Sequence, residues 1–245
     1  MIIDLKVKAM ISDQAEIIRK LIEEGRRRLE EPRKKVTFET GIPEAEWLLN
    51  DLEHFPHLFV CACVMDRQIK AGRAWAIPYL IGKEIGGFEF HEFAEIKLSQ
   101  FKEIFNRLKP HRFNEKMAGY FYSAVQDIHI KYSDGASQIW ANTPKSALVI
   151  RRFLEFGGVG PKIANMAANI LARDFKIPML DFSSIDIAPD RQVKKFFTKI
   201  GLLRKEASNE ELIYLAREIY PEYPGILDIM AWEMGRKIKQ DTRLS

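Results

Sequence analysis

The sequence is poor in the residues from which disulfide frameworks and metal centres are built. It contains two cysteines, Cys61 and Cys63, and both lie in the apolar segment LFVCACVM. Cysteines placed in this way are typical of small core residues. The five histidines are scattered and lack partners at the spacing of zinc ligands. We therefore expect neither a disulfide-stapled fold nor a metal ion held by side chains.

Long apolar stretches are also missing. No stretch approaches the roughly 18 uninterrupted apolar residues that a membrane span requires. The first residues show no basic region followed by an apolar core, as a secretory signal would have. Together with the few cysteines, this predicts a cytoplasmic protein without a membrane partner.

A strong excess of one charge is absent as well. Lys and Arg number 38 and Asp and Glu number 34, so the formal net charge is +4. Positive charge is concentrated in EEGRRRLEEPRKK and VKKFFTKIGLLRK. Such segments help a protein approach a polyanion, but they are more often solvated helix faces. Charge alone does not identify the partner.

The dominant pattern that is present is helical, because apolar residues recur three and four positions apart. Asp13 with Glu16, and Ser208 with Glu211, resemble capping boxes and predict two helix starts. Further helices are predicted near residues 44–52, 57–65, 71–80, 93–108, 115–131 and 144–155, the last entered through Thr143 and Pro144. Residues 2–11 alternate imperfectly, and a strand, an extended arm or a helix remains open there. The pattern predicts an all-α protein.

Three glycines stand between two helical patterns in the segment FGGVGPKIAN, residues 156–165. Glycine permits positive φ and close approach to the main chain, and Pro161 suits the first turn of a new helix that runs to Leu171. Exposed amides at that helix start would form a site for one DNA phosphate. A nucleotide-binding P-loop is excluded, because Ile163 follows Lys162 where Ser or Thr is required. The glycines by themselves fit a plain helix-turn-helix corner equally well.

The neighbouring motifs supply a family resemblance. The segment FGGVGPKIANMAANIL resembles the Leu-Pro-Gly-Val-Gly-x-Lys-Thr-Ala-Asn hairpin of the endonuclease III group in the helix-hairpin-helix (HhH-GPD) DNA glycosylase superfamily. Downstream, IAPDRQVKKFFTKIGL resembles that superfamily's Val-Asp-x-His-Val-x-Arg-Val segment, with Gln192 where histidine is usual. The stretches HLFVCACVMDRQIKAGRAW, NEKMAGYFYSAV and LDIMAWEMGRKIKQ resemble other helices of the family, so the resemblance covers roughly residues 45–240.

The resemblance implies an all-α fold in two parts. One is a six-helix barrel domain at residues 45–178, with the helix-hairpin-helix at 150–171. The other is a helical domain in which residues 1–44 and 179–245 combine, and it carries the catalytic aspartate. Iron-sulfur members have four cysteines just beyond the Gly-Arg of the closing helix, whereas KIKQDTRLS contains none. We therefore expect no cofactor and no iron-sulfur cluster. A K⁺ or Na⁺ ion at the hairpin backbone near Gly158 is the one ion that the resemblance suggests.

The resemblance also implies roles for individual residues. Lys162 corresponds to the nucleophile that forms a Schiff base, and Asp190 to the catalytic carboxylate. The predicted DNA-binding residues are Gly158, Val159, Gly160, Gln68, Arg67 and Arg191, with Gln68 and Arg67 at the wedge that enters the base stack. Asp186 and Asp181 remain alternatives to Asp190, and an aspartate at a helix start can also be a simple cap.

These assignments predict a base-excision-repair DNA glycosylase with abasic-site lyase activity. Its partner is expected to be double-stranded DNA with a damaged base or abasic site, and the protein is expected to act as a monomer. A monofunctional glycosylase and a non-catalytic DNA-binding protein remain alternatives. The preferred lesion stays open among oxidised pyrimidines, 8-oxoguanine and deaminated or mismatched bases. The aromatic residues Phe113, Tyr120, Phe121 and Tyr122 could stack on a base or fill the core.

Overall fold

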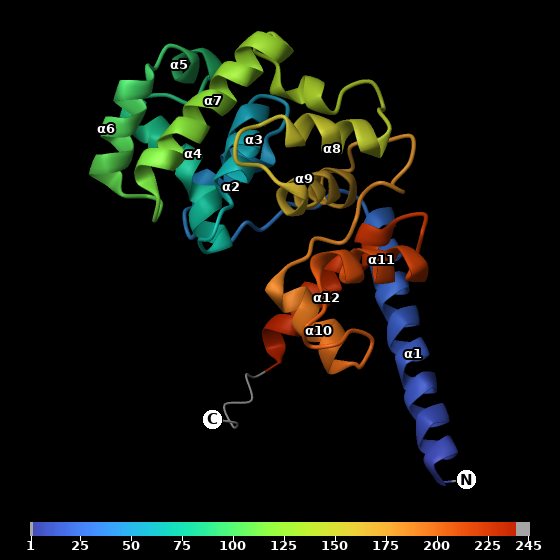
Figure 1. The fold of residues 1–245 in the computed structure, drawn as a ribbon. Helices are drawn as coiled ribbons and strands as arrows, with labels where there is room; N and C mark the ends of the chain where they lie inside the picture. The colour runs from blue at the N-terminus through green and yellow to red at the C-terminus, as the bar shows by residue number, and fades with distance from the viewer. Residues whose placement is uncertain (1, 239–245) are drawn as a thin grey trace, which may run out of the picture. The chain divides into compact units, whose positions relative to one another are not determined.

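The computed structural model describes the backbone of residues 2–238 and the side chains of residues 13–238. Every regular element in this range is helical, which confirms the predicted all-α class. The chain divides into two compact units (Figure 1). The hairpin unit comprises residues 34–144 and 148–167, and the terminal unit comprises residues 1–33, 145–147 and 168–245. The sequence predicted a barrel domain from residue 45 to residue 178, whereas the hairpin unit begins at residue 34 and ends at residue 167.

The hairpin unit is built around one buried helix. Helix α3 (Pro56–Met65) is buried along its whole length. It packs against α4 (Ala71–Ile85) and α7 (Asn114–Tyr132), and α7 also packs against α6 (Leu98–Leu108) (Figure 1). Helix α2 (Pro43–Asn50), helix α5 (Phe90–Ala94) and the 3-10 helix η1 (Ala136–Ile139) complete the shell. The predicted core cysteines, Cys61 and Cys63, are buried in α3 as expected.

Two predicted helices of this unit differ from the observed ones. The segment predicted as one helix at 93–108 forms two, α5 and α6. They are separated because the Lys97 N–H donates to the Gln100 side chain at 2.9 Å and begins a new helix. The helix predicted from Pro144 is α8 (Ser146–Leu154) and begins two residues later. Asn142 and Thr143 both have positive φ, so the chain turns there instead of entering the helix.

The terminal unit brings together the two ends of the described chain. Helix α1 (Ile2–Glu30) runs through Asp13 without a break, so the helix start predicted at Asp13 is wrong and the open choice at residues 2–11 resolves to helix. The unit also contains α10 (Arg191–Lys199), α11 (Asn209–Ile219), η2 (Pro224–Leu227) and α12 (Asp228–Lys237). The capping box predicted at Ser208 and Glu211 is confirmed, with reciprocal bonds of 3.1 and 3.0 Å.

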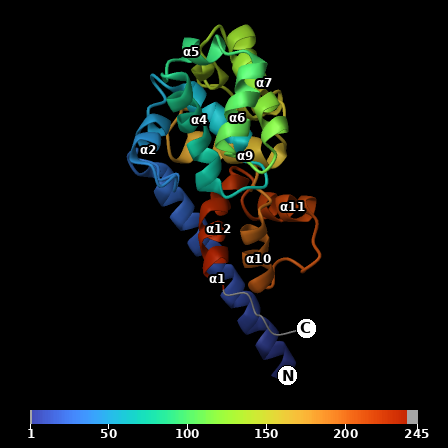
Figure 2. The same cartoon turned by 90° about the vertical axis from the view of Figure 1, so that its left-hand side faces the viewer.

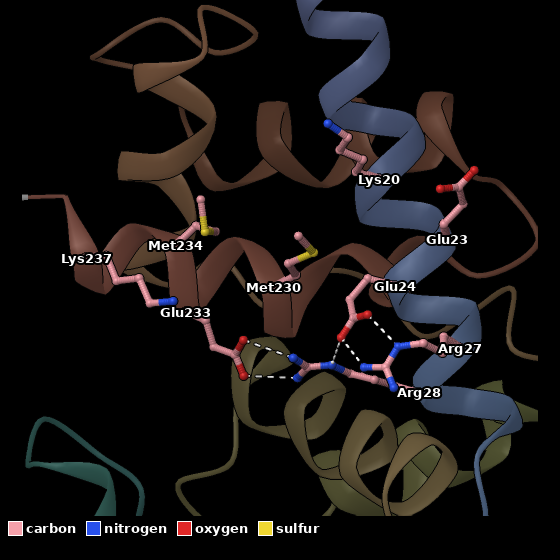
Figure 3. Close-up of a pocket in the computed structure, with 9 residues that line it drawn as sticks. All are labelled: Lys20, Glu23, Glu24, Arg27, Arg28, Met230, Glu233, Met234 and Lys237. Atoms are coloured by element: carbon pink, nitrogen blue, oxygen red, sulfur yellow. Dashed lines mark hydrogen bonds and ion pairs between the residues drawn. The ribbon is translucent and has the colours of Figure 1, made fainter.

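Helix α12 organises the terminal unit, because it packs against both α10 and α1 (Figure 2). Gly235 permits the first contact, since a Cβ there would overlap the backbone of Gln192. The second is fixed by Arg28, whose guanidinium donates two hydrogen bonds of 3.0 Å to the Glu233 carboxylate and one of 2.7 Å to Glu24 (Figure 3). These side chains line an open groove of about 480 Å³ that holds none of the predicted site residues.

None of the helices in residues 2–238 combines the length and the apolar character that crossing a membrane would require.

Candidate active site

The hairpin predicted from the glycines is a tight turn between α8 and α9 (Pro161–Arg173). Gly158 has φ of +88°, a conformation that residues with a Cβ rarely adopt. A Cβ at this position would lie 2.8 Å from Cδ2 of Tyr120. Within the turn, the Val159 N–H donates to the Phe156 carbonyl at 3.1 Å. Glycine is therefore required at 158 by both backbone conformation and the Tyr120 ring.

Pro161 begins α9, as predicted, and this puts Lys162 in the first turn of the helix. The Lys162 side chain is 41% exposed. Its Nζ lies 3.6 Å from Oδ2 of Asp66, whose side chain is 9% exposed. A lysine at a helix start lies at the positive end of the helix dipole, and the carboxylate offsets that unfavourable position. The hairpin unit thus presents a lysine that is both accessible and held by a carboxylate.

Asp66 belongs to the short loop that also carries the predicted wedge residues. Arg67 lies close to the hairpin, with Cζ 5.9 Å from the centre of the Tyr120 ring and Nη1 3.5 Å from the Gly158 carbonyl oxygen. Gln68 has φ of +56° and is exposed. The structure brings Arg67, Asp66 and Lys162 together at one surface of the hairpin unit.

The His111 side chain lies against the backbone of this loop. Its ring is buried, it accepts a 3.1 Å hydrogen bond at Nδ1 from the Phe113 N–H, and it faces the backbone of Met65 and Arg67. Burial, together with the nearby positive charge of Arg73, lowers the pKa of His111. A neutral ring is therefore favoured next to the backbone of the loop.

The predicted catalytic aspartate lies in the terminal unit. Asp190 is the N-cap of α10, where its side chain accepts a 2.7 Å hydrogen bond from the Gln192 N–H. Arg191 follows it and is exposed. The alternative Asp186 is buried and accepts two hydrogen bonds, of 2.7 and 2.8 Å, from Arg217. The other alternative, Asp181, accepts a 2.5 Å bond from the buried Ser146 hydroxyl.

Among the side chains of residues 13–238, no three His, Cys, Asp or Glu groups come together in a way that could hold a metal ion. The predicted K⁺ or Na⁺ near Gly158 stays a prediction. The Arg67 Nη1 lies 3.5 Å from the Gly158 carbonyl oxygen, so a cation bound there would share this oxygen with the Arg67 guanidinium.

Comparison with solved structures identifies the architecture. An endonuclease III captured as a covalent intermediate with DNA matches with a TM-score of 0.56 at 16% identity, over 90% of this chain and 85% of the other. The 8-oxoguanine glycosylase/lyase of Clostridium acetobutylicum matches with a TM-score of 0.52 at 15% identity, over 80% and 68%. The 8-oxoguanine DNA glycosylase of Methanocaldococcus jannaschii matches with a TM-score of 0.51 at 19% identity, over 92% and 95%.

The chain has the fold of the helix-hairpin-helix DNA glycosylases. At these identities the likeness establishes the fold. No protein-family model matches the chain, and no curated protein matches it in sequence.

The structure gives two residues a place at the candidate site that the sequence did not assign to them. Asp66 directly precedes the predicted wedge and could have been singled out as the first charged residue after ten buried ones. Tyr120 was a candidate for base stacking, and the structure places it against the hairpin glycines. Of the other aromatic candidates, Phe121 is a core residue, whereas Phe113 is 39% exposed.

Proposed function

We propose that the chain is a base-excision DNA glycosylase with abasic-site lyase activity. It would act as a cytoplasmic or nucleoid-associated monomer on double-stranded DNA that contains a damaged base. The observation that supports this most directly is Lys162 at the start of α9, accessible and next to a hairpin whose Gly158 has φ of +88°, in a chain with the glycosylase fold. The structural neighbours that act on DNA lesions support the substrate class.

DNA binding would use the hairpin and the loop beside it. The backbone amides of the first turn of α9 and the backbone of Gly158 and Gly160 would hold one phosphate. The target nucleotide has to leave the stack before its sugar can be attacked, at a cost of a few kcal/mol. Gln68 would fill the gap that it leaves, with Arg67 next to it. The positive φ and exposure of Gln68 suit such a role.

The chemical step would use the Lys162 amine as the nucleophile. Its nitrogen lone pair forms a bond to C1′, while the bond from C1′ to the base breaks and its electron pair leaves with the base. Opening of the bond from C1′ to the ring oxygen then gives a Schiff base. Loss of a proton from C2′ expels the 3′ phosphate oxygen and cuts the strand. In this scheme the Asp190 carboxylate stabilises the positive charge that develops on the sugar.

A panel of duplexes, each with a single lesion, tests the proposal. Oxidised pyrimidines, 8-oxoguanine and deaminated or mismatched bases are compared, and base release and strand cutting are recorded separately. Borohydride should trap a covalent complex with the wild type and none with Lys162→Ala. Lys131→Ala is a matched control, because the Lys131 side chain is also 41% exposed and paired with a carboxylate, that of Asp127.

Each alternative gives a different result in this panel. Base release that survives Lys162→Ala without strand cutting indicates a monofunctional enzyme that uses water. Duplex binding without base release from any lesion indicates a non-catalytic DNA-binding protein and overturns the proposal.

A further inference from the structure

Asp66 has a position that its surroundings fix tightly. It follows α3, a helix of ten buried residues, and its own side chain is 9% exposed. Its φ and ψ are −74° and 65°, and the Arg67 N–H donates to the Met65 carbonyl at 2.7 Å. These values describe an inverse γ-turn. The turn directs the Asp66 carboxylate toward Lys162 while the next two residues form the exposed loop.

The loop and the hairpin are joined by two contacts rather than one. The Asp66 carboxylate lies 3.6 Å from the Lys162 Nζ, and the Arg67 guanidinium approaches the Gly158 carbonyl oxygen at 3.5 Å. Tyr120 packs against Gly158 on the same side. A carboxylate held in this way remains beside the lysine amine.

The ion pair between Asp66 and Lys162 is expected to add little to the stability of the folded chain. Burying a carboxylate has a desolvation cost that an ion pair with a partly exposed lysine barely recovers. Chemistry gives a stronger reason for the pair, because the amine has to lose its proton before it can attack C1′. A carboxylate in this position can accept that proton, directly or through one water molecule.

We propose that Asp66 orients Lys162 and accepts its proton, an inference that rests on the function proposed above. The N–H bond of the ammonium breaks and an O–H bond forms on the Asp66 carboxyl group. The electron pair left on Nζ forms the bond to C1′, and the base departs with the electrons of the bond to C1′ and takes a proton from water. Asp66 is thus a second carboxylate of the site, with a different task from that of Asp190.

Single-turnover kinetics with enzyme in excess test this role. Asp66→Asn keeps the size of the side chain and removes its charge. We expect the maximal rate of borohydride trapping to fall about 100-fold, the lower range for loss of a general base. The Kd for a duplex with a tetrahydrofuran abasic analogue should be unchanged. Asp66→Glu, which retains a carboxylate, should recover part of the rate.

Asp51→Asn is the matched control, because Asp51 also directly follows a helix and pairs with a nearby base, His54, at 2.9 Å. It should trap at the wild-type rate. Thermal unfolding checks each variant, and if Asp66→Asn is destabilised, Asp66→Ser carries the same expectation. A wild-type rate in Asp66→Asn overturns the inference, as does an equal loss in the Asn and Glu variants that is accompanied by weaker binding.

Lys162→Ala, run in parallel, separates the two proposals. If Lys162→Ala still traps DNA, the lysine mechanism is wrong and the role of Asp66 falls with it. If Lys162→Ala is inactive and Asp66→Asn is normal, only the role of Asp66 is wrong.

Discussion

The hairpin unit and the terminal unit are held together in different ways. The hairpin unit is almost one continuous stretch of chain, and its largest fully buried side chains are apolar, among them Phe59, Phe93, Phe101 and Phe121. The terminal unit is assembled from three separate segments. Within the longest of these segments, residues 168–245, buried polar contacts join residues that are far apart in sequence.

One network illustrates the second kind of assembly. Asn169, 1% exposed, donates to the Gly225 carbonyl at 2.8 Å and accepts a hydrogen bond from the Tyr223 hydroxyl. The Gly225 N–H in turn donates to the Ile185 carbonyl at 2.7 Å. Buried polar groups need such partners, because each unsatisfied one costs about 1–3 kcal/mol. Apolar burial tolerates many sequences, whereas this network requires specific partners.

The two proposed catalytic residues lie in different units. Lys162 lies in a short motif at the start of its own helix, whereas Asp190 caps a helix in the terminal unit, which contains the Asn169 network. The four predictions below test how far the contrast extends.

The largest expected effect separates catalysis from capping in the terminal unit. Asp190→Asn can still cap α10, because asparagine is an equally good N-cap, but it removes the carboxylate. The single-turnover rate of base release should fall about 100- to 10,000-fold, with little change in melting temperature. Asp186→Asn is the control and should keep activity, since Asp186 is engaged by Arg217. If Asp186→Asn loses base release and Asp190→Asn keeps it, Asp186 is the catalytic carboxylate.

The next prediction concerns the buried network. Asn169→Leu removes the partner of both the Gly225 carbonyl and the Tyr223 hydroxyl, so the free energy of unfolding should fall by about 4 kcal/mol. Urea denaturation measures it. Asn106→Leu in the hairpin unit is the control, because Asn106 is exposed and makes one 3.2 Å bond to Glu115. It should change stability by less than about 0.5 kcal/mol. Equal losses in the two variants would remove the contrast between the units.

Acid should destabilise the hairpin unit through His57. Burial lowers the pKa of His57 to about 4 in the folded chain, where its ring lies 3.0 Å from the Phe88 carbonyl oxygen. The unfolded chain therefore binds the proton first, and about 3 kcal/mol of stability should be lost as pH falls from about 6.5 to 4. His57→Gln should flatten this part of a stability profile measured by denaturation.

His54→Gln is the control for that experiment. Asp51 raises the pKa of the exposed His54, so any contribution from His54 is present at low pH and is lost as pH rises. The acid loss should therefore persist in His54→Gln. Its disappearance there would contradict the assignment to His57.

The smallest effect compares two glycines of the hairpin. Gly158→Ala should cost about 2 kcal/mol, because φ is +88° and the added Cβ would lie 2.8 Å from Tyr120. Gly160→Ala should leave stability within about 1 kcal/mol of the wild type, since no atom beyond its own chain neighbours lies within 4 Å of its Cβ position. If the open space at Gly160 receives a DNA phosphate, this variant should bind duplex DNA more weakly despite normal melting. Normal binding would argue against a phosphate at that position.

Local signals predicted much of the fold. The start of α9 at Pro161, the capping box at Ser208 and most helix positions follow from patterns within a few residues. The errors have the same local origin. Asp13 has the form of a helix start, but α1 begins earlier and passes through it, because a local pattern cannot show that a helix is already under way.

The candidate site was predictable in part for the same reason. Lys162, Gln68 and Asp190 could be named because each lies in a motif that resembles the family. Asp66 lies in the same segment as Gln68, but its place beside Lys162 could not be predicted, because it depends on a 3.6 Å approach to a residue nearly a hundred positions away. The sequence predicted a turn at Gly158. It could not predict that the Tyr120 ring leaves no room for a Cβ at this position.

The sequence by itself determined the helical class, the hairpin and the lysine within it, since periodicity, glycine conformation and helix starts act over a few residues. Only the tertiary structure decided which carboxylate accompanies that lysine in the hairpin unit and which polar groups satisfy one another in the terminal unit. Those choices depend on distances between side chains that are far apart in the chain, and packing alone sets such distances.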